Sequence, residues 1–216
     1  MADPTGASAP RRDADIAQLI VDSGWQMPDR EHGVRCGRFA GVLFDALHLL
    51  LGLETTDRPL TVAAAVFHDI GYLRSERDHH RKSFDLLRDA TQLPFSSDDR
   101  LIVACAARYH GHTSPSIEHA GFTDMSFADQ RRVRRIAAIV RLAAALDASH
   151  LRLIERIEVS EDDGRATLTA YAAREPAIER DRLRESAGGF QQLTQIPIAG
   201  DVVIEHGQLS IDPEQE

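Results

Sequence analysis

The chain has 216 residues, of which 43% are hydrophobic and 27% are charged, as in an ordinary globular protein that can bury a substantial core. The formal net charge of −9 argues against a protein that coats nucleic acid, although local arginine clusters could still hold a small anion. No apolar run approaches the roughly 20 residues needed to span a bilayer, and the first twelve residues lack the apolar segment of a secretory signal. We therefore expect a soluble cytoplasmic protein with no membrane partner.

The two cysteines, Cys36 and Cys105, lie within apolar helical patterns and have no CxxC spacing. This placement predicts two buried thiols in a reducing compartment rather than a disulfide framework.

The first two thirds of the chain show helical periodicity interrupted by Gly, Pro, Ser and Asp. Residues 1–12 are rich in Pro, Ala, Ser and Gly and predict a disordered tail. We expect Pro28-Asp29, Pro59 and Ser96 to start helices, and Gly52 and Gly71 to end them. The predicted helices cover approximately 13–23, 28–52, 59–70, 83–90, 96–110 and 126–150.

The periodicity changes to strict alternation after residue 153. Ile154 to Ser160 and Ala166 to Ala172 alternate around the turn 161–164, which predicts a β-hairpin. A helix over 176–188 and one or two returning strands within 196–204 follow. The predicted fold is mainly α. It comprises the disordered tail, a helical body and a small α+β segment packed on that body, covering 1–12, 13–152 and 153–216.

Histidines recur at the ends of the predicted helices: His32, the pair His68-Asp69, the pair His79-His80, and His110. A single histidine at a helix end is usually a capping or solvated side chain. Several such ends, one of them carrying an adjacent carboxylate, instead favour a shared site. Imidazole nitrogen and carboxylate oxygen together suit divalent ions such as Mn, Fe, Co, Ni or Zn.

Four segments, 31–47, 66–87, 104–110 and 134–152, carry a resemblance to a known family. Through them the sequence resembles the HD-domain superfamily of metal-dependent phosphohydrolases. More narrowly, it is similar to the C-terminal HD domain of the exopolyphosphatase / guanosine pentaphosphate phosphohydrolase (Ppx/GppA) family. The resemblance implies an HD-domain helical bundle with a closing α+β segment. It does not extend to that family's N-terminal actin-like ATPase domain, so polyphosphatase activity is not implied.

The resemblance assigns metal ligands residue by residue. His79 fits the third histidine best, because a serine follows it four positions later, and His80 is the alternative. The implied ligands are His32, His68, Asp69, His79 or His80, and His110.

One position departs from the superfamily pattern. Ala144 stands where the last ligand, an aspartate, is expected. Asp147 lies three residues later, on nearly the same face of the predicted helix but about 4.5 Å further along its axis. Asp147 therefore either binds the ion or orients a histidine that does.

Several cations lie close to these positions and could bind phosphate, because guanidinium groups pair well with phosphate oxygens. The alternative is a solvated, salt-bridged surface. The candidates are Arg74, Arg81, Lys82 and Arg108.

The resemblance implies a phosphohydrolase that uses one or two ions of Mn, Fe, Mg, Zn, Co or Ni to act on a nucleotide or another small phosphoester or phosphoanhydride. Asp69 and His68 would be the catalytic residues, with Asp69 bridging the ions and orienting a hydroxide. Two alternatives stay open: a weakly active or inactive regulatory domain that binds metal or nucleotide, and a purely structural helical module. The hairpin edge could also support a homodimer.

Overall fold

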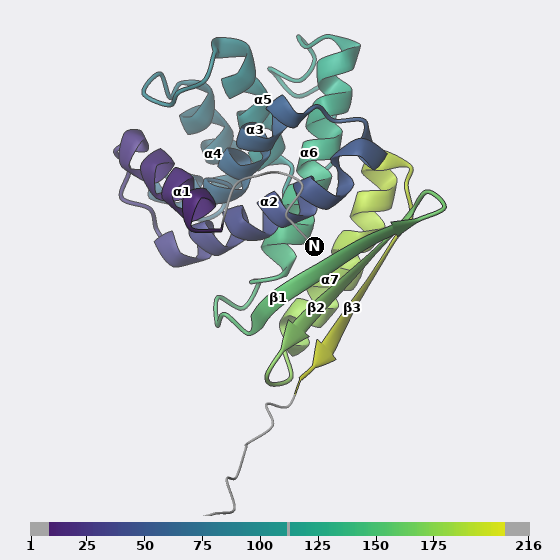
Figure 1. Cartoon of the computed structure of the whole chain (residues 1–216). Helices are drawn as coiled ribbons and strands as arrows, with labels where there is room; N and C mark the ends of the chain where they lie inside the picture. Colours follow the sequence, from purple (N-terminus) through teal and green to yellow (C-terminus); the bar gives the residue numbers. More distant parts are fainter. Residues whose placement is uncertain (1–8, 112, 206–216) are drawn as a thin grey trace, which may run out of the picture.

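The structure is a computed structural model that describes residues 9–111 and 113–205, with side chains described from residue 15 onward. A helical body leads into a small three-stranded sheet (Figure 1). The body consists of α1 (Ala9–Ser23), α2 (Arg30–Leu51), η1 (Thr55–Asp57), α3 (Arg58–Val66), η2 (Ile70–Leu73), α4 (His79–Arg88), α5 (Ser97–Arg108) and α6 (Phe127–Ala145). The remaining elements are β1 (Ile154–Asp162), β2 (Arg165–Ala172), α7 (Ala177–Thr194) and β3 (Ile198–Ile204).

Side-chain caps define the starts of the longer helices. Asp29 accepts a hydrogen bond from the backbone N–H of His32 at the start of α2. Ser96 and Ser126 do the same for α5 and α6, as expected of residues that satisfy the free amides of a first turn. Gly52, with φ of 57°, ends α2 in the left-handed conformation. These predicted boundaries are confirmed.

Other helix ends differ from the prediction. The first helix begins at Ala9, four residues early, while residues 1–8 of the predicted tail lie outside the described residues. In the body, α3 ends at Val66 and α4 begins at His79, so the His68-Asp69 pair lies in the turn before η2. The last helix of the body, α6, ends at Ala145 rather than near residue 150. The chain then turns toward β1 with a positive φ at His150.

The C-terminal sheet has the order β1-β2-β3. The two strands β1 and β2 form the predicted antiparallel hairpin, turning through Asp163 and Gly164, both with positive φ. Between β2 and the parallel strand β3, the chain crosses over through α7, which ends six residues later than predicted. This helix packs between the sheet and α6 (Figure 1), so the sheet holds α7 against the helical body. Residues 206–216 of the predicted α+β segment lie outside the described residues.

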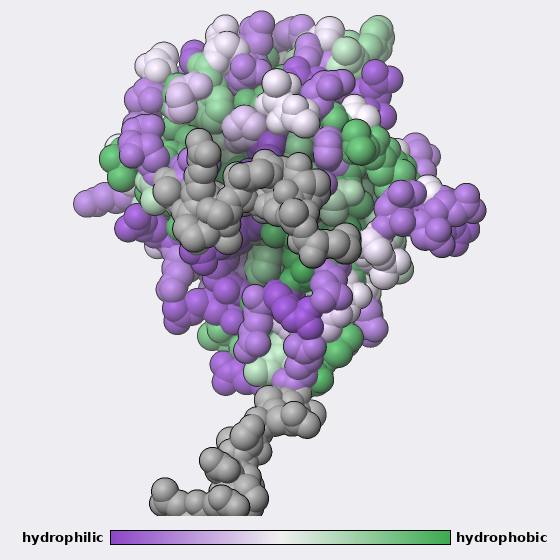
Figure 2. Space-filling view, viewed as in Figure 1, coloured by the Kyte–Doolittle hydropathy of each residue, from purple (hydrophilic) through white to green (hydrophobic). Residues whose placement is uncertain are grey.

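The helices α2, α3, α5 and α6 pack around one core. Short alanine runs line it, at 63–65 on α3 and 106–107 on α5, and they let the helix backbones approach closely. Both thiols, Cys36 and Cys105, are buried and free, as predicted. Among the described residues, no helix has the length and apolar character to cross a membrane. Polar side chains cover much of the face shown in Figure 2, with apolar residues in small groups.

Candidate metal centre

The His68-Asp69 pair is held by the packing of α4 against the turn that contains it. Ser83 donates a hydrogen bond to the carbonyl of His68 (2.6 Å) and accepts one from the backbone N–H of Gly71 (2.9 Å). A Cβ at position 71 would lie 1.9 Å from the carbonyl oxygen of His79. Gly71 is therefore needed for this close approach of α4, rather than as the left-handed helix stop that the sequence suggested.

Three histidines share one hydrogen-bonding arrangement. In His68, His79 and His110, Nδ1 donates to the carbonyl oxygen of the residue three positions earlier, at 2.7, 3.0 and 2.7 Å. A carbonyl can only accept, so Nδ1 carries the proton and Nε2 keeps its lone pair. The backbone thus sets both the tautomer and the direction of each ring, as in many metal sites.

The free Nε2 atoms converge on Asp69. The Nε2 of His68 lies 3.4 Å from Oδ2, and those of His110 and His79 lie 3.5 and 3.7 Å from Oδ1. The Nε2 of His32 lies 3.3 Å from that of His68. Although Oδ1 is buried, it has no hydrogen-bond partner among the described residues. Ligand atoms that share one ion at about 2.1 Å in a tetrahedron are about 3.4 Å apart, so this spacing fits a cation.

The protonation states also suit ligation. Burial lowers the pKa of His68 and His110, so both rings are neutral near pH 7. Burial raises the pKa of the Asp69 carboxyl, but the neighbouring histidines, His68 first, outweigh it and lower the value to about 2. Neutral imidazoles around a carboxylate are the forms that bind a metal ion.

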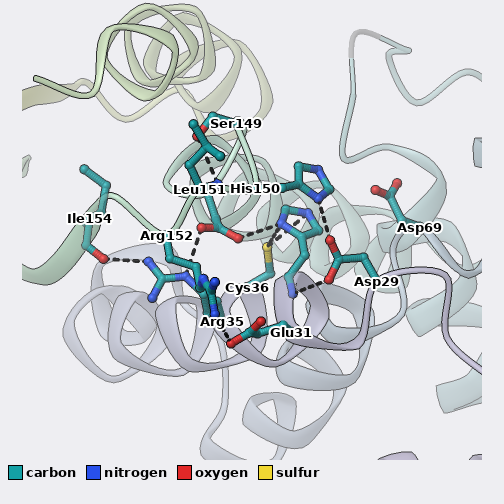
Figure 3. Close-up of polar contacts among 12 residues, drawn as sticks. Asp29, Glu31, Arg35, Cys36, Asp69, Ser149, His150, Leu151, Arg152 and Ile154 are labelled. Atoms are coloured by element: carbon teal, nitrogen blue, oxygen red, sulfur yellow. Dashed lines mark hydrogen bonds and ion pairs between the residues drawn. The ribbon is translucent and has the colours of Figure 1, made fainter.

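Asp147 lies behind His32, on the side away from Asp69. One carboxylate oxygen accepts a hydrogen bond from His32 Nδ1 and the other from Arg35 Nε, both at 2.9 Å. Arg35 also donates to the carbonyl of Ile154 at the start of β1 (Figure 3). Both oxygens of Asp147 are therefore engaged. The geometry favours the alternative in which Asp147 orients a histidine over direct binding of the ion.

His150 belongs to the cluster but is not among the residues that the sequence predicts. Its ring stacks on that of His32 with centroids 3.9 Å apart, and its Nδ1 donates to Asp29 at 2.9 Å (Figure 3). His32, Asp69 and His150 each offer a ligand atom within 4.8 Å of the other two. The only signal in the sequence is Ala144, which stands where the resemblance to the HD superfamily predicts an aspartate ligand.

The alternatives His79 and His80 both face the cluster. Together with His110, they offer three ligand atoms within 4.8 Å of one another. Gly111 leaves room for the ring of His80, since a Cβ there would lie 2.9 Å from it. Both histidines are thus placed to contribute to a second position next to the first.

Cys36 also borders the cluster, although the sequence predicts only a buried thiol at this position. Its Sγ lies 3.6 Å from Nε2 of His32. Burial, followed by the charge of Asp147, raises the pKa of this thiol well above its usual value. Without a metal ion the sulfur is therefore a protonated thiol that packs against the ring. Cys36, His32 and His68 nevertheless each offer a ligand atom within 4.8 Å of the other two.

The cluster opens into a cavity of about 300 Å³. Its far wall comes from the end of α6 and from α7, and its lining includes Arg141, Ala144, Ala145, Ala148, Arg182 and Ser186. None of the four predicted phosphate-binding cations lines this cavity. Arg74 and Lys82 line a separate groove beside Trp25, Arg81 is exposed on α4, and Arg108 lies against the rings of Phe84 and Tyr109.

The chain matches a family of known proteins over most of its length. A family model described as Ppx/GppA phosphatase, domain III, matches residues 23–181. This range runs from the end of α1 into α7 and contains every histidine and carboxylate of the cluster. No curated protein matches the chain at a significant level.

Proposed function

Since the chain belongs to the Ppx/GppA phosphatase family through its domain III, we propose that it is a metal-dependent phosphohydrolase of the HD type. Its substrate would be a nucleotide or another small phosphoester or phosphoanhydride. The observation that carries this proposal is the convergence of His32, His68, His79 and His110 on Asp69, whose buried Oδ1 has no hydrogen-bond partner among the described residues. A helical scaffold gains no stability from burying imidazoles around an unsatisfied carboxylate oxygen.

The donor set suits one or two divalent ions. His32, His68 and His150 would hold a first ion together with Asp69, and His79, His80 and His110 a second. Asp69 lies between the two groups and could bridge them. Among Mn, Fe, Co, Ni, Zn and Mg, this many imidazole nitrogens favours the transition metals over Mg, which prefers oxygen ligands.

When bound, such ions lower the pKa of a coordinated water and polarise a phosphoryl oxygen. The protein's own residues position the reactants. The Asp69 carboxylate accepts a hydrogen bond from the attacking water and directs its oxygen toward phosphorus. As the new P–O bond forms, the attacking water releases a proton to solvent, the bond to the leaving oxygen breaks, and that oxygen takes a proton from solvent. Asp147 and the backbone carbonyls keep the imidazole rings in place throughout.

The second candidate function is a regulatory domain that binds metal or nucleotide without efficient turnover. Ala144 favours it, because the α6 face of the cavity offers no carboxylate where the superfamily expects one. The two functions differ in turnover and agree in metal binding.

The test combines metal analysis with an activity assay. Protein purified without chelator is expected to contain stoichiometric transition metal and to hydrolyse p-nitrophenyl phosphate or nucleotides with Mn²⁺. Asp69→Asn is expected to lose at least a hundredfold in kcat, while Asp78→Asn, an exposed carboxylate at the start of α4, retains activity. Bound metal without turnover would favour the regulatory domain, and absence of metal would refute both the hydrolase and a regulatory domain that binds metal.

A further inference from the structure

Arg141 is a buried cation in the wall of the histidine cavity. It lies on α6 and is only 8% exposed. Its Nε donates to the carbonyl of Tyr109 and its Nη2 to that of Thr113, both at 2.7 Å. Both acceptors are neutral, and across 9–111 and 113–205 no carboxylate lies within ion-pair distance of Arg141. The guanidinium therefore keeps its full charge.

Other partly buried arginines near the core have a carboxylate as their partner. Arg35, for example, contacts Asp147, and Arg132 contacts Asp57. Burial of an ion is strongly unfavourable unless an opposite charge offsets it. Burial lowers the pKa of Arg141, but a guanidinium stays protonated at any physiological pH. The charge of Arg141 is thus unbalanced unless an anion occupies the cavity.

The surroundings of Arg141 leave room for such an anion. Ala144 and Ala145, three and four positions later on the same face of α6, and Ala148 in the turn after the helix line the cavity with methyl groups. On the facing helix α7, a Cβ at Gly189 would lie 2.8 Å from Nη1 of Arg141. This glycine lets the guanidinium fit between α6 and α7 without being displaced.

We infer that Arg141 is the anion-binding residue of this cavity and receives the terminal phosphoryl group of a phosphomonoester or phosphoanhydride beside the metal ligands. The inference rests on the proposed function and names its substrate class. A guanidinium can donate two parallel hydrogen bonds to phosphoryl oxygens. The cavity, at about 300 Å³, is at the small end of ligand sites. A monoester needs space for one substituent, whereas a diester needs space for two.

A second arginine indicates how a substrate would enter the cavity. Arg182 lies on α7, about half exposed, and forms an ion pair at 3.0 Å with Glu185, which also lines the cavity. The buried Arg141 is therefore deep in the cavity, and an ion-paired arginine is at its mouth. The phosphoryl group would lie against Arg141, and the rest of the substrate would point outward past Arg182.

Calorimetric titration of Arg141→Gln with inorganic phosphate tests the subsite. We expect the phosphate Kd to rise about 10- to 100-fold, as for loss of a charge-assisted hydrogen bond, while metal content stays at the wild-type level. Arg131→Gln, an exposed arginine on the same helix, is the matched control and should bind as the wild type does. Unchanged phosphate affinity in Arg141→Gln, or no binding by the wild type at millimolar phosphate, would overturn the inference.

Three further measurements extend this test. Arg141→Lys keeps the charge but loses the paired donors, so it should show a smaller loss and serves if the glutamine variant does not fold. Repeating the titration on chelated protein separates the proposed hydrolase function from the proposed phosphate subsite. A wild type that contains no metal refutes the hydrolase, whereas the effect of Arg141→Gln on phosphate binding can still be measured.

The substrate class is tested with two model substrates. We expect p-nitrophenyl phosphate to have at least a tenfold higher kcat/KM than bis(p-nitrophenyl) phosphate, and a preference for the diester would overturn that assignment.

Discussion

At the scale of single residues, the site depends on histidines whose second nitrogen is already committed. Three Nδ1 atoms donate to backbone carbonyls, and those of His32 and His150 donate to Asp147 and Asp29. Each ring is therefore already in the tautomer and orientation that leave Nε2 free to bind an ion. This arrangement lowers the entropy lost when an ion binds.

His150 is expected to act as a ligand in place of the aspartate that is absent at position 144. Its φ of 58° is unfavourable for a residue with a side chain, and such strain is often kept at functional positions. We predict that His150→Gln weakens Zn²⁺ or Co²⁺ binding by at least tenfold, because one imidazole nitrogen is lost from the ion. Competition with a chromophoric chelator measures this change.

Two companion variants make that measurement specific. Asp29→Asn retains a good N-cap for α2 but loses the charged partner of His150, so it should weaken binding by a smaller factor. His48→Gln, on α2 but stacked on Phe44 away from the cavity, should leave affinity unchanged. Equal affinity of His150→Gln and the wild type would mean that His150 only shields the site.

The residue scale also shows what the sequence could predict of the site. His32, His68, Asp69, His79, His80 and His110 meet around one cavity, although up to 78 positions separate them (His32 to His110). The signal in the sequence is that histidines recur at the ends of several predicted helices. Arg141 carries no such signal, because the apolar stretch around it predicts only a helix of the core. Only the packing of α7 onto α6 shows that it borders a cavity.

At the scale of elements, the boundaries that depend on local chemistry were predictable. Side-chain caps at Asp29, Ser96 and Ser126 and the turn at Asp163-Gly164 act within a few residues, so the sequence alone identifies them. The end of α6 was missed because it depends on distant contacts. The turn after Ala145 is stabilised by Asp147 reaching α2, which no local pattern reveals.

Asp147 joins the turn after α6, helix α2 and, through Arg35, the start of β1. It is 1% exposed. We predict that Asp147→Asn lowers the free energy of unfolding by about 3 kcal/mol, the lower end for a broken buried ion pair, because Arg35 keeps some access to water. Urea unfolding measures this loss.

A neighbouring pair provides the control. Glu31 and Arg152 connect α2 with the segment before β1, but both side chains are more than half exposed. Glu31→Gln should therefore change the unfolding free energy by less than about 1 kcal/mol. If both variants cost the same, the Asp147 network contributes no more than a surface contact.

At the scale of the whole molecule, the helical body and the α+β segment form one unit around the site. The sheet packs α7 against α6, and α7 closes the cavity opposite the histidines. The position of α7 follows from the crossover between β2 and β3. Sequence patterns predicted these elements separately, and their contact with the histidines became visible only in the assembled fold.

Stability of the metal-free protein should depend on pH through the buried imidazoles. His68 and His110 have pKa values below the 6.5 of an unfolded chain, because burial disfavours their charged forms. Between the folded and unfolded values, the unfolded chain binds more protons, so the free energy of unfolding rises with pH and levels off above about 7. Asp69, with its pKa lowered to about 2, contributes with the same sign. Its contribution is complete above its unfolded pKa of about 4 and is lost as pH falls through about 2.

Urea unfolding of chelated protein from pH 5 to 8 tests this dependence. We expect stability to fall as the pH drops below about 6.5, well above the range in which carboxylates titrate, and His110→Gln to show a shallower slope. Added metal should steepen the fall, since protons and the ion compete for the same Nε2 atoms. A free energy that stays constant between pH 5 and 7, or that rises on acidification, would mean that these imidazoles are protonated in the folded protein and that the cluster is not preformed for a cation.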